Sequence, residues 1–218
     1  MTSVDDQTGL ATAPRGTRLP RSARRAQLLD AAQQVFVENG YHAAGMDEIA
    51  ERAGVSKPVL YQHFPGKLEL YLALLDDANE KLLDAILGAL DSTTDNKRRV
   101  EATMEAYFEF VSAEGAPHRL VFESDLTNDP QVRQRAEEVD RISSVAVAKL
   151  VRENVSVSEP EALLLAMAVV GMGRSSARFW LAQGRSIPLK EAARTVAALA
   201  WRGIAALPRS PESGESVS

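Results

Sequence analysis

Cysteine is absent from this chain of 218 residues, and histidine occurs only three times. Without thiols, neither a disulfide framework nor a thiolate metal site is possible. His42, His63 and His118 lie too far apart for the ligand spacing of a zinc site. We therefore predict no metal and no cofactor.

Long apolar runs are also scarce. The longest uncharged apolar run covers 162–173, which is 12 residues, whereas a helix needs about 20 to span a bilayer. The first 14 residues contain no apolar core of the kind that a signal peptide requires. These two absences predict a cytoplasmic protein without a membrane partner.

Recognisable catalytic patterns are missing as well. The chain has no G-x-S-x-G elbow, no phosphate-binding P-loop and no paired-carboxylate pattern. Gly171-Met172-Gly173 resembles the opening of a dinucleotide loop, but no strand pattern precedes it and position 176 is serine. We predict that the protein is not an enzyme.

What the sequence does contain is helical periodicity. Apolar residues recur at three- and four-residue spacing, and strand-like alternation of useful length does not occur. With 45% hydrophobic residues, the chain can bury one or two substantial cores. The predicted class is all-α, with helices over about 21–40, 46–53, 57–64, 68–91, 97–113, 130–154, 162–183 and 186–207.

The segment 46–64, MDEIAERAGVSKPVLYQHF, carries the strongest functional signal. Two short helices joined by so tight a turn must cross steeply, as in a helix-turn-helix. Gly54 suits the left-handed position after the first helix. Ser56 is placed to cap the second helix with its hydroxyl, and Pro58 is tolerated in a first turn. The second helix presents polar groups suited to phosphates and base edges, namely Lys57, Tyr61, Gln62 and His63.

The flanks of this segment extend the pattern. An amphipathic helix ends in F-x-x-x-G-Y before the motif, and Y-x-H-F is followed by a lysine one turn later. From about Arg24 to Leu75 the chain closely resembles the DNA-binding domain of the tetracycline-repressor (TetR) family of bacterial regulators. The resemblance covers about a quarter of the chain. It implies an all-helical homodimer whose larger C-terminal domain binds a small molecule that weakens DNA binding.

The resemblance also implies contacts to double-stranded DNA. Lys67 matches a phosphate-contacting lysine, so Lys67→Ala should lower the salt slope of binding by about one. Where many members carry Thr or Ser before the second helix, this chain has Ala44 and Gly45, and a backbone amide or a cap oriented by Asp47 must serve instead. The predicted DNA-binding residues are Arg24, Gly45, Met46, Ser56, Lys57, Pro58, Val59, Tyr61, Gln62, His63 and Lys67.

The charge distribution agrees with this interpretation. The net charge is −5, but residues 15–67 carry a balance of +3 and residues 68–218 a balance of −6. Basic charge is thus concentrated at the motif, as a DNA footprint requires. The arginine-rich stretch before residue 21 is either a solvated linker or an arm along the minor groove. The predicted organisation is a disordered basic arm over 1–21, a DNA-binding domain over 22–67, a helical domain over 68–207 and a disordered tail over 208–218.

The helical domain is predicted to dimerise and to bind an effector. A helix that is apolar nearly all round, as in 163–181, is buried in a monomer core or covered by another subunit. We favour a two-fold dimer with a four-helix bundle, through Gly171, Ser175, Trp180, Ala197 and Trp201. Candidate pocket residues, each of which is alternatively plain core, are Met104, Tyr107, Phe108, Phe122, Met167, Met172, Arg174 and Phe179.

The predicted function is therefore a sequence-specific regulator that reads a palindromic operator. A repressor released by an unknown small molecule is favoured, and activation stays open. The effector would stabilise a dimer whose two DNA-binding domains no longer match the operator spacing. Two alternatives come from other classes: a nonspecific DNA-binding or protein-contact module without an inducer, and an all-α enzyme.

Overall fold

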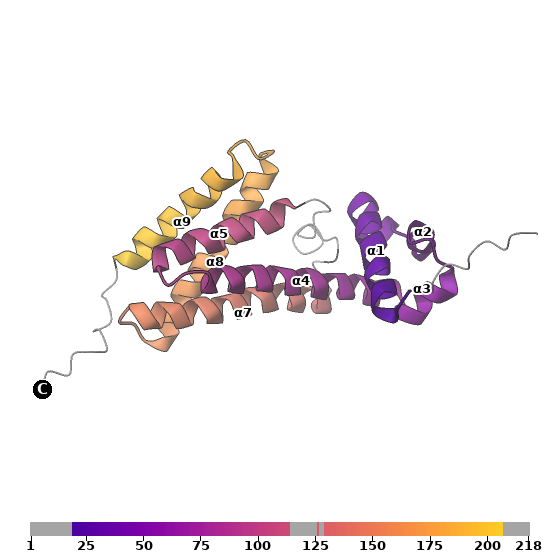
Figure 1. Ribbon diagram of the computed structural model, residues 1–218, viewed down its shortest axis with the longest axis horizontal. Helices are drawn as coiled ribbons and strands as arrows, with labels where there is room; N and C mark the ends of the chain where they lie inside the picture. The colour runs from indigo at the N-terminus through magenta and orange to yellow at the C-terminus, as the bar shows by residue number, and fades with distance from the viewer. Residues whose placement is uncertain (1–18, 114–125, 127–128, 207–218) are drawn as a thin grey trace, which may run out of the picture.

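The computed structural model describes residues 19–113, 126 and 129–206, and helices dominate this part of the chain (Figure 1). The all-α class predicted from periodicity is confirmed. The helices are α1 (Arg21–Ala43), α2 (Met46–Arg52), α3 (Lys57–His63), α4 (Lys67–Asp91), α5 (Asn96–Ser112), α7 (Pro130–Asn154), α8 (Glu159–Ala182) and α9 (Leu189–Ala205). Phe122, most of the basic arm and the tail from 208 lie outside the described residues.

Helices α1, α2 and α3 form a small head at one end of an elongated molecule, and α5, α7, α8 and α9 form the body at the other (Figure 1). The core of the head contains buried apolar side chains from all three of its helices, among them Val35, Ile49 and Leu60. Burying such side chains supplies the main driving force for folding.

Helix α4 belongs to both parts and runs from the head into the body beside α7 (Figure 1). Its first half contributes Leu70, Leu74 and Ala78 to the core of the head. Its second half contributes Leu82 and Ile86 to a core shared with α7. The position of α4 therefore fixes how the head is joined to the body.

Side-chain caps set the starts of the body helices. The Asp95 carboxylate accepts from the Arg98 backbone N–H at 3.0 Å, and Asp129 accepts from Gln131 at 2.8 Å. The Ser158 backbone N–H donates to the Glu161 carboxylate at 2.7 Å, which is the reciprocal bond expected of a capping box. These acceptors satisfy amides that a helix cannot pair within itself.

The outer surface of α8 is unusually apolar. Leu164 is 70% exposed and Phe179 is 68% exposed, while Leu199 of α9 is 66% exposed. By length and composition α8 passes the test for a membrane-crossing helix, with mean hydropathy 1.2 and 22% of its best window buried. The predicted 12-residue run lies inside this longer helix. Large exposed apolar side chains gathered on one face indicate a contact surface.

Candidate nucleic-acid interface

The turn between α2 and α3 has the geometry of a helix-turn-helix. Gly54 adopts φ +63°, a left-handed conformation that glycine takes without a Cβ penalty. The Val55 backbone N–H reaches back to the Ala50 carbonyl at 3.0 Å, which closes the end of α2. Ile49 and Leu60 are fully buried in the same core. The predicted crossing of two short helices over a glycine turn is confirmed.

With Leu60 buried, α3 turns its polar side chains outward. Tyr61 is 47% exposed, Lys57, Pro58 and Gln62 are exposed, and Val59 and His63 are half-buried. This is the arrangement that a recognition helix requires, because base edges and phosphates are reached only by side chains free of the core.

The cap predicted for α3 is wrong. Ser56 occupies the cap position, but among the described residues its hydroxyl accepts no hydrogen bond from the first turn. Pro58 removes one of the two amides that a capping hydroxyl normally binds, which leaves only the Val59 N–H. The Val59 N–H instead donates to the Ser56 carbonyl at 3.0 Å. The exposed Ser56 hydroxyl is therefore available to a partner outside the chain.

The start of α2 depends on its backbone. Gly45 is the cap residue, and no described side chain caps this helix. Asp47 does not serve as the cap, because its carboxylate lies 2.6 Å from the Lys57 ammonium across the turn. Both side chains are more than half exposed, and such surface pairs contribute only about 0–1 kcal/mol. A DNA phosphate would compete for Lys57 at little cost.

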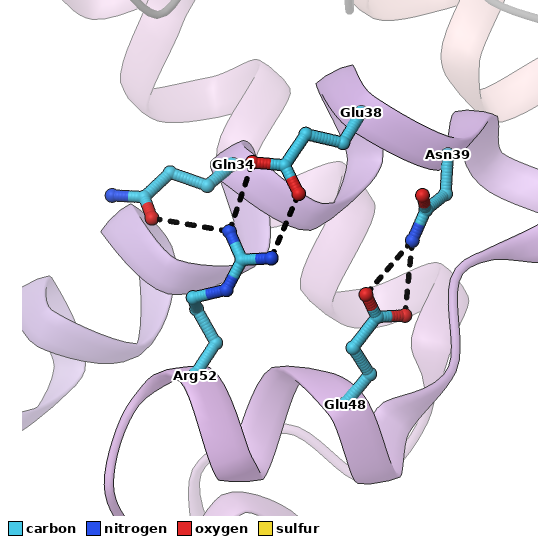
Figure 2. A network of polar contacts seen from close by, with 5 residues as sticks. All are labelled: Gln34, Glu38, Asn39, Glu48 and Arg52. Atoms are coloured by element: carbon cyan, nitrogen blue, oxygen red, sulfur yellow. Dashed lines mark hydrogen bonds and ion pairs between the residues drawn. The ribbon is translucent and has the colours of Figure 1, made fainter.

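A polar network joins α1 to α2 (Figure 2). The Arg52 guanidinium donates to both oxygens of Glu38, at 3.0 and 2.7 Å, and to the Gln34 amide oxygen at 3.4 Å. The Asn39 amide donates to Glu48 at 2.9 Å. The hydrogen bond from Arg52 lowers the pKa of Glu38. Arg52 was counted in the basic footprint, but its charge is compensated within the head.

The first turn of α1 meets α3 across a cleft of about 320 Å³ lined by Leu19, Arg21, Arg24, Val59, Gln62 and His63. Four of these six residues belong to the predicted DNA-binding set. Leu19 and Arg21 do not, because no motif position marks them. The structure thus brings Arg24, on α1, to the same surface as the recognition helix.

Arg24 is positioned through Gln27, a residue that the sequence did not single out. The Arg24 guanidinium donates to the Gln27 amide oxygen at 2.7 Å, and the Gln27 amide nitrogen donates to the Ala53 carbonyl at 2.8 Å. Ala53 is the last residue before the glycine turn. Gln27 therefore ties α1 directly to the helix-turn-helix.

Removing Arg24 is expected to weaken binding to all duplexes alike. In Arg24→Ala the logarithmic salt slope should become shallower by about 0.9 for each bound subunit, because one phosphate contact is lost. Fluorescence anisotropy over a salt series measures the slope. Arg98→Ala, an exposed arginine at the start of α5 in the body, is the matched control and should leave it unchanged. Equal slopes for all three proteins would contradict a phosphate contact.

Lys67 has a different environment from the predicted one. Its ammonium donates to the backbone carbonyls of Tyr41, His42 and Ala44, at 2.8, 3.2 and 3.0 Å. A lysine ammonium has three protons, and each has an acceptor within the head. The phosphate contact stays a prediction, and it requires the ammonium to exchange at least one of these carbonyls for a phosphate oxygen.

The predicted pocket residues separate into two groups. Met104 and Phe108 are buried in the body, and Met172 is half-buried. Met167 is 47% exposed and Phe179 is 68% exposed, so in the single chain both side chains lie at the surface, apart from the buried candidates. Helix α8 is apolar nearly all round, and its sequence alone does not show which side faces inward.

A small polar cluster lies among the buried candidates. The Arg174 guanidinium of α8 pairs with the Asp140 carboxylate of α7. The buried Tyr107 hydroxyl has no hydrogen-bond partner among the described residues, and burial raises its pKa. Burial also raises the pKa of Asp140, against the opposing effect of Arg174. Unpartnered buried polar atoms are uncommon, and this one adjoins apolar Met104 and Phe108.

The predicted dimer residues also fall into two groups, accessible and buried. Gly171 and Trp201 are half-buried and Ser175 is exposed, so all three are accessible to a partner. Trp180 is only 6% exposed and donates its indole N–H to the Ile187 carbonyl at 2.7 Å. Ala197 is fully buried in the same core. The assignment of Trp180 and Ala197 to a subunit interface is wrong, because both already pack within their own subunit.

This chain is similar in sequence and in fold to known proteins. Residues 28–74 match the family described as bacterial regulatory proteins, tetR family. The chain is 45% identical over 194 residues to the HTH-type transcriptional activator FasR of Mycolicibacterium smegmatis, covering 89% of each chain. It is 30% identical to the solved structure of a TetR-like transcriptional regulator from Rhodococcus sp. RHA1, with a TM-score of 0.69 and coverage of 87% of this chain and 100% of that one.

The same fold occurs in a more distant structure, that of the transcriptional regulator FadR from Bacillus subtilis in complex with stearoyl-CoA. There the TM-score is 0.67 at 18% identity, with coverage of 80% of this chain and 96% of that one. At this identity the likeness shows the fold alone.

Proposed function

The chain belongs to the tetR family of bacterial regulatory proteins and is a transcriptional regulator of that family, and on this basis we propose that it reads a specific DNA site through α3. The observation that supports this most is the division of α3 into two faces. Leu60 is fully buried, whereas its neighbour Tyr61 is 47% exposed. The core thus holds the helix while its polar face is presented to a groove.

The side chains of that face suit different parts of the duplex. Lys57 can donate to a base edge or to a phosphate, Gln62 has the donors and the acceptor that read base edges in the major groove, and the apolar atoms of Pro58 and Val59 suit a thymine methyl. Tyr61 and His63, together with the uncapped Ser56 hydroxyl, suit phosphate oxygens and set the register. Gly45 and Met46 would approach the backbone at the start of α2, where helix amides face outward.

We assign the apolar face of α8 and α9 to a second copy of the chain. Along α8, Leu164, Gly171, Ser175 and Phe179 recur at helical spacing on one side, with small residues between large ones. Such a face permits close packing of two helices from each subunit in a bundle. A two-fold dimer presents α3 twice, so the operator should be palindromic.

The body is proposed to hold a small-molecule effector near Tyr107, Met104, Phe108 and Arg174. The buried Tyr107 hydroxyl without a described partner supports this site, as does the apolar surrounding of Met104 and Phe108. An effector acts only through different affinities for the two dimer conformations. Stearoyl-CoA is the first probe, chosen because a protein of the same fold binds it.

The direction of regulation is proposed as activation. The sequence favoured a repressor, but the relative that shares 45% identity over 89% of the chain is named a transcriptional activator. The fold itself does not determine the direction, because both outcomes begin with the same DNA contact.

The test of this function is selection of duplexes from a random pool by the full chain. We expect a palindromic consensus, and we expect a reporter behind that sequence to rise when the protein is present. Recovery of no common sequence would overturn specific reading and favour the nonspecific alternative. A consensus with a falling reporter would overturn only the direction.

A further inference from the structure

The side-chain amide of Gln27, in the second turn of α1, makes two hydrogen bonds to different parts of the head. Its oxygen accepts from the Arg24 guanidinium at 2.7 Å, and its nitrogen donates to the Ala53 carbonyl at 2.8 Å. Only this orientation of the amide pairs each donor with an acceptor, because a guanidinium has no acceptor and a carbonyl has no donor. Gln27 therefore connects the end of α2 to an arginine of the predicted DNA-binding set.

The Ala53 carbonyl is a fixed anchor for this amide. Ala53 is 4% exposed and belongs to the core of the head, and its own N–H donates to the Ile49 carbonyl at 2.9 Å. The N–H groups of the next two residues also donate back into α2. Carbonyls at the end of a helix have no intrahelical partner, and Gln27 supplies one for Ala53. The position of the Gln27 amide is thus set by the helix-turn-helix itself.

Arg24 keeps most of its hydrogen-bonding capacity in this arrangement. A guanidinium has five donors, and the described hydrogen bond to Gln27 uses one of them. Arg52 differs, because the Glu38 carboxylate compensates its charge at 2.7 Å. Arg24 is half-buried in the cleft that it shares with His63 of α3. A neutral amide thus orients Arg24 without neutralising its charge.

We propose that Gln27 is a positioning residue for DNA binding, which holds the Arg24 guanidinium in place for a phosphate before the duplex arrives. The inference rests on the proposed function, in which DNA lies along α3. Ordering a long side chain on binding costs affinity, and a side chain that is already ordered avoids much of that cost. Because the anchor is the end of α2, the phosphate contact is made at a fixed place relative to the recognition helix, and such contacts set the register on the duplex.

The test is a double-mutant cycle between Gln27→Met and Arg24→Ala, measured by fluorescence anisotropy on folded full-length chains. Methionine keeps an unbranched side chain and a similar helix propensity but has no amide. We expect Gln27→Met to lower the affinity about 2- to 12-fold for each bound subunit, which corresponds to the ordering of one long side chain. The salt slope should not change, because Arg24 keeps its charge. In the Arg24→Ala chain, Gln27→Met should have no further effect.

The matched control is Gln34→Met, the same substitution farther along α1, where the Gln34 amide contacts Arg52 and not the cleft. This variant should bind DNA as the wild type does. An equal loss of affinity from Gln27→Met with and without Arg24 would overturn the inference, because Gln27 would then act independently of the arginine. Wild-type affinity in folded Gln27→Met would also overturn it, since the amide would only stabilise the head.

If Gln27→Met does not fold, Gln27→Lys decides. An ammonium can donate to the Ala53 carbonyl but offers Arg24 no acceptor. In the Gln27→Lys chain, Arg24→Ala should therefore cost about 2- to 12-fold less affinity for each bound subunit than it costs in the wild type. The added charge is present with and without Arg24, so it cancels in this comparison. An undiminished cost of Arg24→Ala would contradict the positioning role.

Failure of the inference and failure of the proposed function differ in outcome. Phosphate contacts carry no sequence information, so the cycle is measured on the selected duplex and on an unrelated duplex of equal length, with the same coupling expected on both. A wild-type chain that selects no common sequence would overturn specific reading, and the coupling on the unrelated duplex would still decide the inference. A wild-type consensus without coupling between Gln27 and Arg24 would overturn the inference alone.

Discussion

Replacing Leu164 with glutamate is expected to separate the protein into monomers and to lower its affinity for the selected duplex by about 10²–10⁴-fold, because linking two binding modules raises affinity by that factor. Leu164 is 70% exposed on the outer face of α8. Two carboxylates brought together in an apolar bundle would have to be buried unpaired. Analytical ultracentrifugation measures the mass, and anisotropy measures the affinity.

The matched control is Leu87→Glu, which places the same charge on an exposed leucine of α4 (38% exposed). This variant should remain a dimer and should bind DNA as the wild type does. If Leu164→Glu also stays dimeric, the proposed interface on α8 is wrong. If it becomes monomeric without loss of affinity, then the operator is not read by two subunits at once.

Leu60 and Tyr61 are neighbours on α3, but alanine substitutions at the two positions should have opposite effects: one should lower stability and the other should weaken DNA binding. Leu60 is fully buried in the core of the head, so Leu60→Ala should lower the free energy of unfolding by about 2–5 kcal/mol. Tyr61 is 47% exposed, so Tyr61→Ala should change stability by no more than about 0.5 kcal/mol. Its effect should instead be a loss of about 1.5–3 kcal/mol of binding free energy, because a hydrogen bond to a charged phosphate is lost.

Chemical denaturation measures the free energy of unfolding of both variants, and DNA titration measures their binding free energy. Each variant is the control for the other, since they differ by one position on the same helix. Loss of stability in Tyr61→Ala would mean that this side chain is part of the core. Unchanged binding by a folded Tyr61→Ala would remove it from the DNA-reading face.

The helix-turn-helix could be predicted because its determinants are local. Gly54 needs a left-handed backbone, and Ile49 and Leu60 need to be buried, and all three lie within 12 consecutive residues. Neighbours along the chain constrain one another through turn and helix geometry. The same holds for Asp129 and Ser158, whose caps act within three residues.

Long-range roles could not be predicted in this way. The partners of Lys67 lie 23 to 26 residues away, and those of Arg52 lie 14 and 18 residues away. The family resemblance suggested a phosphate for Lys67, but not the three carbonyls that the fold places around its ammonium. The exposure of Met167 and Phe179 could not be predicted for another reason, since an all-round apolar helix has no periodicity that marks its inner side.

The double membership of α4 has a practical consequence for protein fusions. Leu70, Leu74 and Ala78 belong to the core of the head, which also contains Val132 of α7, and a second core shared with α7 begins at Leu82. A fragment cut after residue 67 would expose the core of the head to water. A chimaera that exchanges the effector response of two such regulators should therefore take α4 and the first turns of α7 from the same donor as the head, because Val132 of α7 is buried in that core.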